Sequence, residues 1–524
     1  MVITVGTGAI SEEEERATGF VGEHDYAVQD LDESAGVRRL LVKNPWCGGP
    51  SWKPTTTRWQ HSLQRDGTEL PQLGLGGSYK VDNCLWVTLE DVAQNFESMY
   101  LNWNPKLFSH RHDHHFKWNM PPKLLSSTLL QNPQFSIVSP TGGLVWILIS
   151  RHFVDEELEI LRNKTTNLAA TSRQLGFMSI LVFDSKGKRV QVSDGETYRG
   201  PYVDSPQTLA RLNTSAGKRY TVVLDQHEFP LKKYTFTMSA FSNSPIEVQD
   251  AVEPMPRSKE VTAAWTRRTA GGSAACATYY TNPQYKITLT EATPLSLLLS
   301  TDSRNVYVHF DLVWAHGKRV TSVRVKDLVA SSGEYRRGCV EAHVPHVDAG
   351  TYTLVCSTFE AEQLADFVIR ITSKASVAIE PIAAEAAGKI RTVLEPLSLS
   401  DQIDQMRAPL SVNWLTRASM SIWKSSKTPS SHDGSRPPSS MLIRLAVVMG
   451  RGPEQITVAV SGDGNFQDPW VALQTPDFDM EPDKIRAHGM WLVVEGVGLN
   501  STKQMIEGIL YSDAPVQIGA WEPI

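Results

Sequence analysis

The first hundred residues contain two short apolar runs joined by a charged turn. Residues 26–28 form one run and residues 40–43 the other, and acidic residues, serine and Gly36 lie between them. Apolar runs that flank a turn of this composition are typical of a β-hairpin. The pattern therefore predicts a hairpin that brings together the polar residues at the outer ends of its two strands, His24 and Asn44.

From Phe116 onward the pattern is that of a β protein. Short apolar or alternating runs recur between turn residues, as expected for the strands of an antiparallel sandwich. These runs cover residues 135–138, 145–149, 178–183, 220–224 and 234–238. We predict that residues 108–250 form one such sandwich.

The following segment repeats this pattern. Asn132-Pro133-Gln134-Phe135 recurs as Asn282-Pro283-Gln284-Tyr285, an offset of 150 residues, and a Tyr-Thr strand at 220 recurs at 352. The sequence therefore predicts a second copy of the module over residues 251–376. Trp118 and Trp265 precede the matching strands, and we expect both to be core residues.

The last part of the chain, residues 377–524, predicts a linker and a third sandwich. Residues 377–408 are rich in Ala, Glu and Ile/Leu and favour a linker that contains a short helix, whereas apolar runs at 441–449, 455–460 and 491–496 indicate strands. The Ser/Pro-rich segment 424–440 lacks the apolar residues that a packed core needs and is expected to be a disordered loop. The expected fold class is mostly β.

The candidate chemistry lies at the hairpin ends. A histidine whose ring is held by an asparagine is half of a thiol protease site, because the imidazole takes the proton of a cysteine thiol while the amide oxygen accepts the other ring N–H. His24 and Asn44 are these residues, and Trp46 could shield their hydrogen bond from water.

These motifs resemble a known family. His24-x-Tyr26-Ala27-Val28 followed by Asn44-Pro45-Trp46 is similar to the histidine and asparagine motifs of calpain-type cysteine proteases. Residues 85–92 resemble the calpain segment that closes this half of the catalytic domain, and residues 101–105 with the His-rich stretch after them resemble most the fungal PalB branch. The resemblance assigns residues 1–107 to the second half of a papain-like catalytic domain and the sandwiches to calpain domain III modules.

The resemblance also implies a function and partners. The PalB branch implies a cysteine endopeptidase of alkaline-pH signalling that processes a zinc-finger transcription factor at endosomal assemblies of the ESCRT type. Domain III modules bind partners or lipid head groups and perform no chemistry themselves. Localisation would then be cytoplasmic, with recruitment to an endosomal or plasma membrane.

The nucleophile expected from this resemblance is missing. Enzymes of this type run in the order Cys, His, Asn, whereas all five cysteines, Cys47, Cys84, Cys276, Cys339 and Cys356, follow His24. Met1 opens a strand-like run, which favours a fragment whose catalytic cysteine lies upstream. The chain alone is then expected to be inactive. Cys47 is a weaker candidate nucleophile, since a small half-buried thiol is the ordinary role at its position.

No metal or cofactor is predicted. The histidines of residues 110–115 look like ligands, but neighbouring residues on an extended strand point to opposite faces, so we expect a linker rather than a zinc site. The calcium-ligand pattern of calpains is replaced by Pro54-Thr55-Thr56-Thr57, so we expect little or no calcium dependence.

Composition reduces the number of functional classes to which the protein could belong. With 41% hydrophobic and 21% charged residues the chain is an ordinary globular protein, and its net charge of −6 offers no basic stripe for nucleic acid. No apolar run is long enough for a transmembrane helix. Two hypotheses remain: a calpain-type endopeptidase represented by its His/Asn half, and a catalytically inactive adaptor that binds endosomal partners through its sandwiches.

Overall fold

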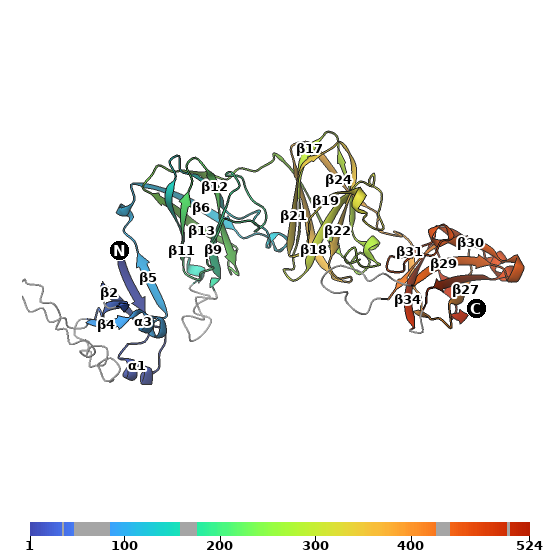
Figure 1. Cartoon of the computed structure of the whole chain (residues 1–524), viewed down its shortest axis with the longest axis horizontal. Coiled ribbons are helices and arrows are strands. Elements are labelled where there is room, and N and C mark those ends of the chain that lie inside the picture. Colours follow the sequence, from blue (N-terminus) through green and yellow to red (C-terminus); the bar gives the residue numbers. More distant parts are fainter. Residues whose placement is uncertain (34–35, 47–83, 158–174, 426–440, 500–502) are drawn as a thin grey trace, which may run out of the picture. The chain divides into compact units, whose positions relative to one another are not determined.

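The computed structural model describes residues 1–33, 36–46, 84–157, 175–425, 441–499 and 503–524. The described chain is mostly strand, as the sequence predicted, and the ladders between its strands are antiparallel (Figure 1). It contains three short α-helices, α1 (Glu12–Thr18), α3 (Leu89–Asn95) and α6 (Pro482–His488). Most of the Ser/Pro-rich segment, residues 426–440, lies outside the described residues.

The chain divides into two compact units. Unit 1 contains Met1–Met120, Asn132–Arg189 and Gly195–Val252, and unit 2 contains Pro121–Gln131, Val190–Asp194 and Glu253–Ile524.

Unit 1 begins with a small antiparallel sheet. Its strand order is β4 (Cys84–Thr88), β3 (Arg39–Lys43), β2 (Asp25–Asp32), β1 (Val2–Gly6), β5 (Ser98–Asn102). One face packs against α3 and the segment around Phe20, where Val5, Tyr26, Val42 and Val87 are buried completely. Helix α1 begins at a capping box, because the Ser11 hydroxyl accepts from the Glu14 N–H and the Glu14 carboxylate accepts from the Ser11 N–H.

The first sandwich, also in unit 1, has two sheets. One sheet has the order β10 (Tyr198–Arg199), β9 (Phe177–Phe183), β12 (Arg219–His227), β7 (Gln134–Val138), β14 (Glu247–Asp250). The other has the order β11 (Gln207–Thr214), β8 (Gly143–Arg151), β13 (Lys233–Ser242), β6 (His110–Asn119). Alternate residues of both sheets, Trp118 among them, form one apolar core.

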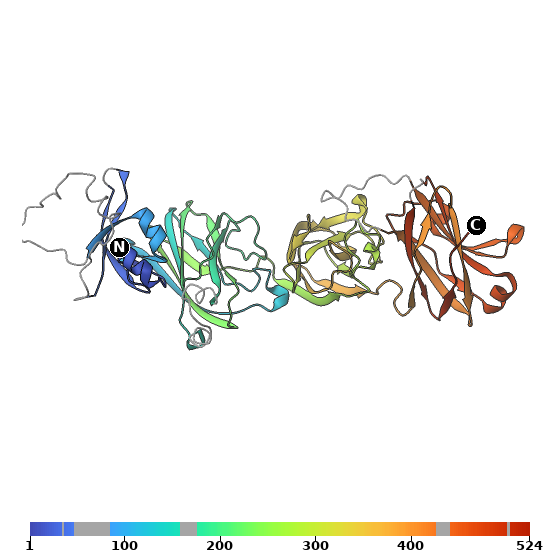
Figure 2. The same ribbon diagram turned by 90° about the horizontal axis from the view of Figure 1, so that it is seen from below.

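The second sandwich lies in unit 2. One sheet has the order β15 (Arg257–Trp265), β23 (Ala365–Ser373), β17 (Thr293–Thr301), β21 (Cys339–Val347). The other has the order β19 (Leu328–Ser331), β18 (Tyr307–Val313), β22 (Gly350–Thr358), β16 (Gln284–Leu289), β24 (Val377–Ile382), and β20 (Arg336–Arg337) pairs with β18. Seen from below, these strands surround a single interior (Figure 2).

The strand registers show the internal repeat. Ile137 of β7 pairs with Tyr220 of β12, and Ile287 of β16 pairs with Tyr352 of β22. The sheet orders also correspond, with β6 and β15 as terminal strands and with β14 and β24 as terminal strands. The repeated Asn-Pro-Gln motif therefore precedes the same strand of the same sheet in both sandwiches.

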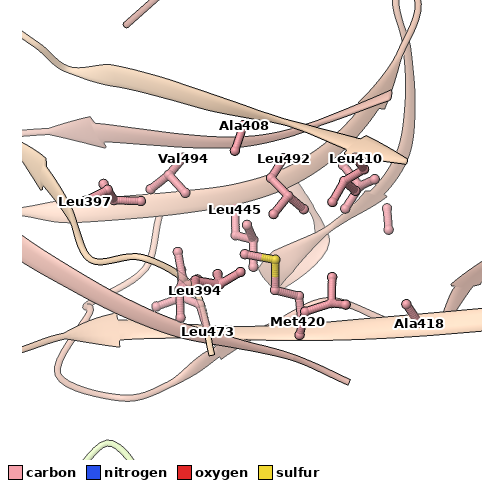
Figure 3. Packing of buried hydrophobic residues seen from close by; sticks show 14 of the residues in the cluster. Leu394, Leu397, Ala408, Leu410, Ala418, Met420, Leu445, Leu473, Leu492 and Val494 are labelled. Carbon is pink, nitrogen blue, oxygen red and sulfur yellow. The ribbon is translucent and has the colours of Figure 1, made fainter. Parts of the chain in front are cut away.

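The third sandwich closes unit 2. Its first sheet contains β25 (Ile390–Val393), β34 (Gln504–Ser512), β28 (Thr416–Lys424) and β31 (Leu473–Gln474), with β26 (Leu397–Leu399) and β32 (Phe478–Met480) paired at the side. Its second sheet contains β30 (Ile456–Val460), β29 (Leu442–Met449), β33 (Met490–Val497), β27 (Gln405–Val412) and β35 (Val516–Ile518), with β36 (Glu522–Pro523) paired to β27. Leu410, Leu492 and Val494 of this sheet face Met420 and Leu473 of the other (Figure 3).

Two local predictions are wrong. The short helix expected within residues 377–408 is absent, because β24 pairs with β16, β25 pairs with β34, and the Ala/Glu-rich stretch between them forms a turn. The second sandwich accordingly continues past residue 376. The histidines of residues 110–115 belong to β6 rather than to a linker. In both cases pairing with distant strands decides the conformation. Such pairing cannot be predicted from local composition.

Candidate functional site

The β2–β3 hairpin positions the candidate catalytic residues. Ala27 pairs with Lys43 and Val28 with Val42. Because side chains alternate between the faces of a strand, this register puts His24, Tyr26 and Asn44 on the same face, the one that carries the buried Val42. The predicted hairpin therefore places the imidazole and the amide at one end of the apolar core.

The two side chains form a direct hydrogen bond. Nε2 of His24 lies 3.1 Å from Oδ1 of Asn44. Since an amide oxygen only accepts, this contact assigns the ring proton to Nε2 and leaves Nδ1 as the basic nitrogen. Among the described residues, no group forms a hydrogen bond with Nδ1. The ring thus presents a lone pair that is free to take a proton.

Trp46 lies against the same hydrogen bond. The centroids of its indole ring and the His24 imidazole are 4.3 Å apart, and its backbone N–H donates to Oδ1 of Asn44 at 3.0 Å. The amide oxygen is therefore fixed from two sides. The indole is itself 52% exposed, so it covers the imidazole on one side while remaining open to solvent on its other side.

Thr7 and Tyr26 also hold His24 in place. The Thr7 hydroxyl accepts from the His24 N–H at 3.1 Å and donates to the Val21 carbonyl at 2.6 Å. The Tyr26 ring is fully buried, lies edge-on to the imidazole at 4.8 Å, and its hydroxyl accepts from the Val21 N–H. Burial raises the pKa of Tyr26, so this phenol stays neutral. No sequence pattern pointed to Thr7, because its partner His24 is 17 residues away along the chain.

The flanking acids do not belong to the site. Glu23 and Asp25 are both exposed, and they alternate with His24 along the chain.

The described cysteine of unit 1, Cys84, faces away from His24. It pairs with Lys43, whose side chain points to the face opposite Asn44. Its thiol donates to the Gln29 side chain at 3.3 Å, and burial raises its pKa. Cys84 is therefore a protonated, partnered thiol rather than a nucleophile for this histidine. Cys47 lies outside the described residues.

The cysteines of unit 2 have structural surroundings. Cys356 is completely buried in the core of the second sandwich, and burial raises its pKa. Cys339 donates to the Ser127 carbonyl at 2.9 Å, and burial raises its pKa to about 12. The Cys276 thiol lies 3.7 Å from the Ser273 hydroxyl.

The histidine-rich strand β6 does not assemble a metal site. Its histidines divide between the two faces, since His114 packs against Phe135 while Nδ1 of His115 bonds the Thr237 hydroxyl at 2.8 Å. Within the described ranges, no three His, Cys, Asp or Glu side chains are grouped so that they could hold a metal ion.

Comparison with known proteins now identifies the family. A calpain-like protease palB/cpr-8 of Neurospora crassa is 36% identical over 99% of this chain and 65% of its own length. A calpain-like protease palB of Emericella nidulans is 35% identical over 99% of this chain and 59% of its own length. The chain belongs to the PalB-type calpain-like protease family.

Further matches fit the PalB assignment. Residues 385–523, which form most of the third sandwich, match the C-terminal domain of calpain-like protease palB-like proteins. Human calpain-7 is 28% identical over 71% of this chain and 45% of its own length. The chain thus spans about three-fifths of the length of the fungal PalB proteins it matches. No helix among the described residues is both long and apolar enough to cross a membrane.

Proposed function

We propose that this chain supplies the base half of a cysteine endopeptidase site. His24 is the base, Asn44 orients it and Trp46 shields their hydrogen bond. The nucleophilic thiol comes from a segment outside the 524 residues. The observation that carries this proposal is the His24–Asn44 contact of 3.1 Å, in which Nε2 donates to the amide oxygen and Nδ1 remains available as the base.

The proposed reaction gives His24 two proton transfers and Asn44 an orienting role. Nδ1 of His24 removes the proton of the thiol, and the resulting thiolate attacks the peptide carbonyl carbon. The imidazolium then returns that proton to the departing amine nitrogen as the C–N bond breaks. Water, deprotonated by the same nitrogen, hydrolyses the thioester and restores the thiol. Asn44 keeps the ring in one tautomer throughout without adding a negative charge.

Substrate and location extend this proposal through the family. The substrate is a protein, by resemblance a zinc-finger transcription factor, and the site of action is a cytoplasmic assembly of ESCRT type on an endosomal membrane. No calcium requirement is proposed, since the stretch that departs from the calpain pattern, residues 54–57, lies outside the described residues.

The test is reconstitution with the part that this chain lacks. The chain is co-expressed with the portion of the Neurospora crassa relative that it does not cover, and the complex is isolated through a tag on that portion. We expect casein cleavage that iodoacetamide blocks, and no cleavage by either part alone. His24→Ala should lower kcat/KM by about 10²–10⁴, the usual contribution of a positioned base, and Asn44→Ala should lower it by less.

The matched control is His110→Ala, which removes a histidine from the first sandwich and should leave cleavage unchanged. An isolated complex that cleaves nothing, or cleavage that survives His24→Ala, would refute the proposal and favour the non-catalytic adaptor. Cleavage by the chain alone that is lost on Cys47→Ser would instead assign the nucleophile to Cys47.

A further inference from the structure

The second sandwich has an open side where its two sheets both end. β15 is the terminal strand of one sheet and β24 the terminal strand of the other. Between the beginnings of these strands lies a cavity of about 340 Å³. We call this cavity, with the exposed edge of β15 beside it, the β15 slot.

The slot has a basic wall and an apolar floor. Arg257 and Lys259 of β15 line it together with Ile371 and Val377, which belong to the core of the sandwich. Ser258, Ser373 and Ser376 complete the lining. Such a surface suits a ligand that presents a negative charge.

The two cations of the slot are uncompensated. Across the described chain, neither the Arg257 guanidinium nor the Lys259 ammonium forms an ion pair or a hydrogen bond. The neighbouring acids are already engaged: Glu260 points to the other face of β15 and pairs with Arg370 at 2.6 Å, and Glu380 of β24 pairs with Lys286 at 3.2 Å. Two adjacent positive charges that lack a partner attract an anion.

The edge of β15 offers main-chain groups beside these charges. The strand is nine residues long and, among the described strands, it pairs only with β23. Its other edge therefore exposes alternating N–H and C=O groups, which an extended peptide can pair with as an added strand. In such a pair the side chains directly opposite each other are about 4.5–5.5 Å apart at Cβ, close enough for a carboxylate to reach the cations.

We propose that the β15 slot binds an extended acidic peptide segment of a partner protein, which adds to β15 as a strand. Carboxylates at alternate positions of the peptide lie opposite Arg257 and Lys259, and the residues between them point to the other face of the added strand. A second copy of this chain fits less well, because antiparallel pairing about the centre of β15 sets apolar residues opposite the two cations. The proposal concerns unit 2 alone and does not depend on His24 or on peptidase activity.

The experiment measures binding of a fluorescein-labelled ten-residue peptide with Glu at alternate positions and Val or Thr between them. Fluorescence anisotropy with the full 524-residue chain should show saturable binding. The affinity should fall as salt is raised from about 50 to about 300 mM, because the charges are exposed and screened. Arg257→Glu with Lys259→Glu should weaken binding at least tenfold, and the milder Arg257→Gln with Lys259→Gln should weaken it to a lesser degree.

The matched control is Arg267→Glu with Arg268→Glu, the same change of charge at two exposed residues just beyond β15. These variants should bind the peptide as the wild type does, and circular dichroism should show all variants folded. A peptide of equal charge with proline at alternate positions, which cannot donate main-chain hydrogen bonds there, should bind weakly.

Four results would overturn the proposal. The first is binding by the Arg257/Lys259 variants that equals that of the wild type, and the second is a loss of the same size in the Arg267/Arg268 control. The third is undiminished binding of the proline peptide, and the fourth is displacement of the acidic peptide by inorganic phosphate at equal concentration. Either of the last two would make the slot a site for a free anion instead of a strand.

Discussion

The first and second sandwiches share one arrangement of strands but carry different residues on their surfaces. The registers place His110 of β6 opposite Ser242, and Arg257 of β15 opposite Ser373. His112 likewise corresponds to Lys259, each two residues further along its strand. On the other sheet, Glu247 pairs with Val138 where Val377 pairs with Leu289.

This difference changes the charge that each sandwich carries at its open side. In the second sandwich the positions carry two permanent cations beside an apolar residue. In the first they carry two histidines beside an acid, Glu247, which is itself paired with Arg219 at 3.4 Å. The positions that pack the core are apolar in both copies, whereas the positions at the open side diverge because packing does not restrict them. Recognition can therefore differ between two copies of one fold.

The buried tryptophans give the largest expected effect and test the shared frame. Trp118 and Trp265 are 2% and 1% exposed, and each packs in the core of its own sandwich. Either tryptophan replaced by alanine should cost about 3–5 kcal/mol, the usual range for a large aromatic residue in a core. Hydrogen exchange on peptides of that sandwich measures the loss. A cost below about 1 kcal/mol in one of them would show that the two frames are not equivalent.

Phenylalanine at the same positions should separate the two sandwiches. The Trp265 indole N–H donates to the Cys356 carbonyl at 3.1 Å, whereas the buried indole N–H of Trp118 has no partner in the described structure. Trp265→Phe should therefore be about 1–2 kcal/mol more destabilising than Trp118→Phe, because only the first loses a buried hydrogen bond. Hydrogen exchange measures both losses of stability. Equal losses in the two variants would contradict the hydrogen bond between Trp265 and the Cys356 carbonyl.

Histidines in place of the two cations of the β15 slot should make peptide binding depend on pH. With Arg257→His and Lys259→His, the second sandwich carries the pair found in the first. Histidine loses its charge near pH 6.5, so the affinity for the acidic peptide should fall about tenfold between pH 5.5 and 7.5. The wild type keeps its charge and should show no such fall. Anisotropy titrations at the two pH values provide the comparison, and a parallel fall in both proteins would place the titrating group elsewhere.

A smaller effect concerns Glu341, which stands where the first sandwich has Leu209. Its carboxylate accepts from the Ser296 hydroxyl and the Gln191 amide, both at 2.7 Å, with His343 nearby on the same strand, and burial raises its pKa. A raised pKa in the folded state favours the neutral acid. Its contribution to stability is therefore complete below about pH 4.5 and is lost as the pH rises through the folded value.

The test for Glu341 is the pH dependence of unfolding. Glu341→Gln keeps an acceptor for both hydrogen bonds and should abolish the decline in midpoint temperature above pH 4.5. Leu209→Gln at the corresponding position of the first sandwich serves as control and should leave the decline intact. A decline that persists in Glu341→Gln would assign it to another group, His343 being the nearest.

Features that repeat over short distances could be predicted from the amino-acid pattern alone. Alternation and turn residues predicted the β2–β3 hairpin, with His24 and Asn44 together at its open end. The repeated Asn-Pro-Gln motif predicted two copies of one sandwich, because identical strand starts produce identical registers. The motifs around His24 and Asn44 also sufficed to indicate the family.

Only the tertiary structure decided the features that depend on distant pairing. The contact of Asn44 with Nε2 rather than Nδ1, the anchoring of His24 by Thr7, and the orientation of Cys84 away from the site all follow from how separate segments meet. The expected helix within residues 377–408 is replaced by strands for the same reason. The β15 slot depends on two terminal strands that lie more than a hundred residues apart in sequence. No local sequence pattern indicates that two such strands lie beside each other.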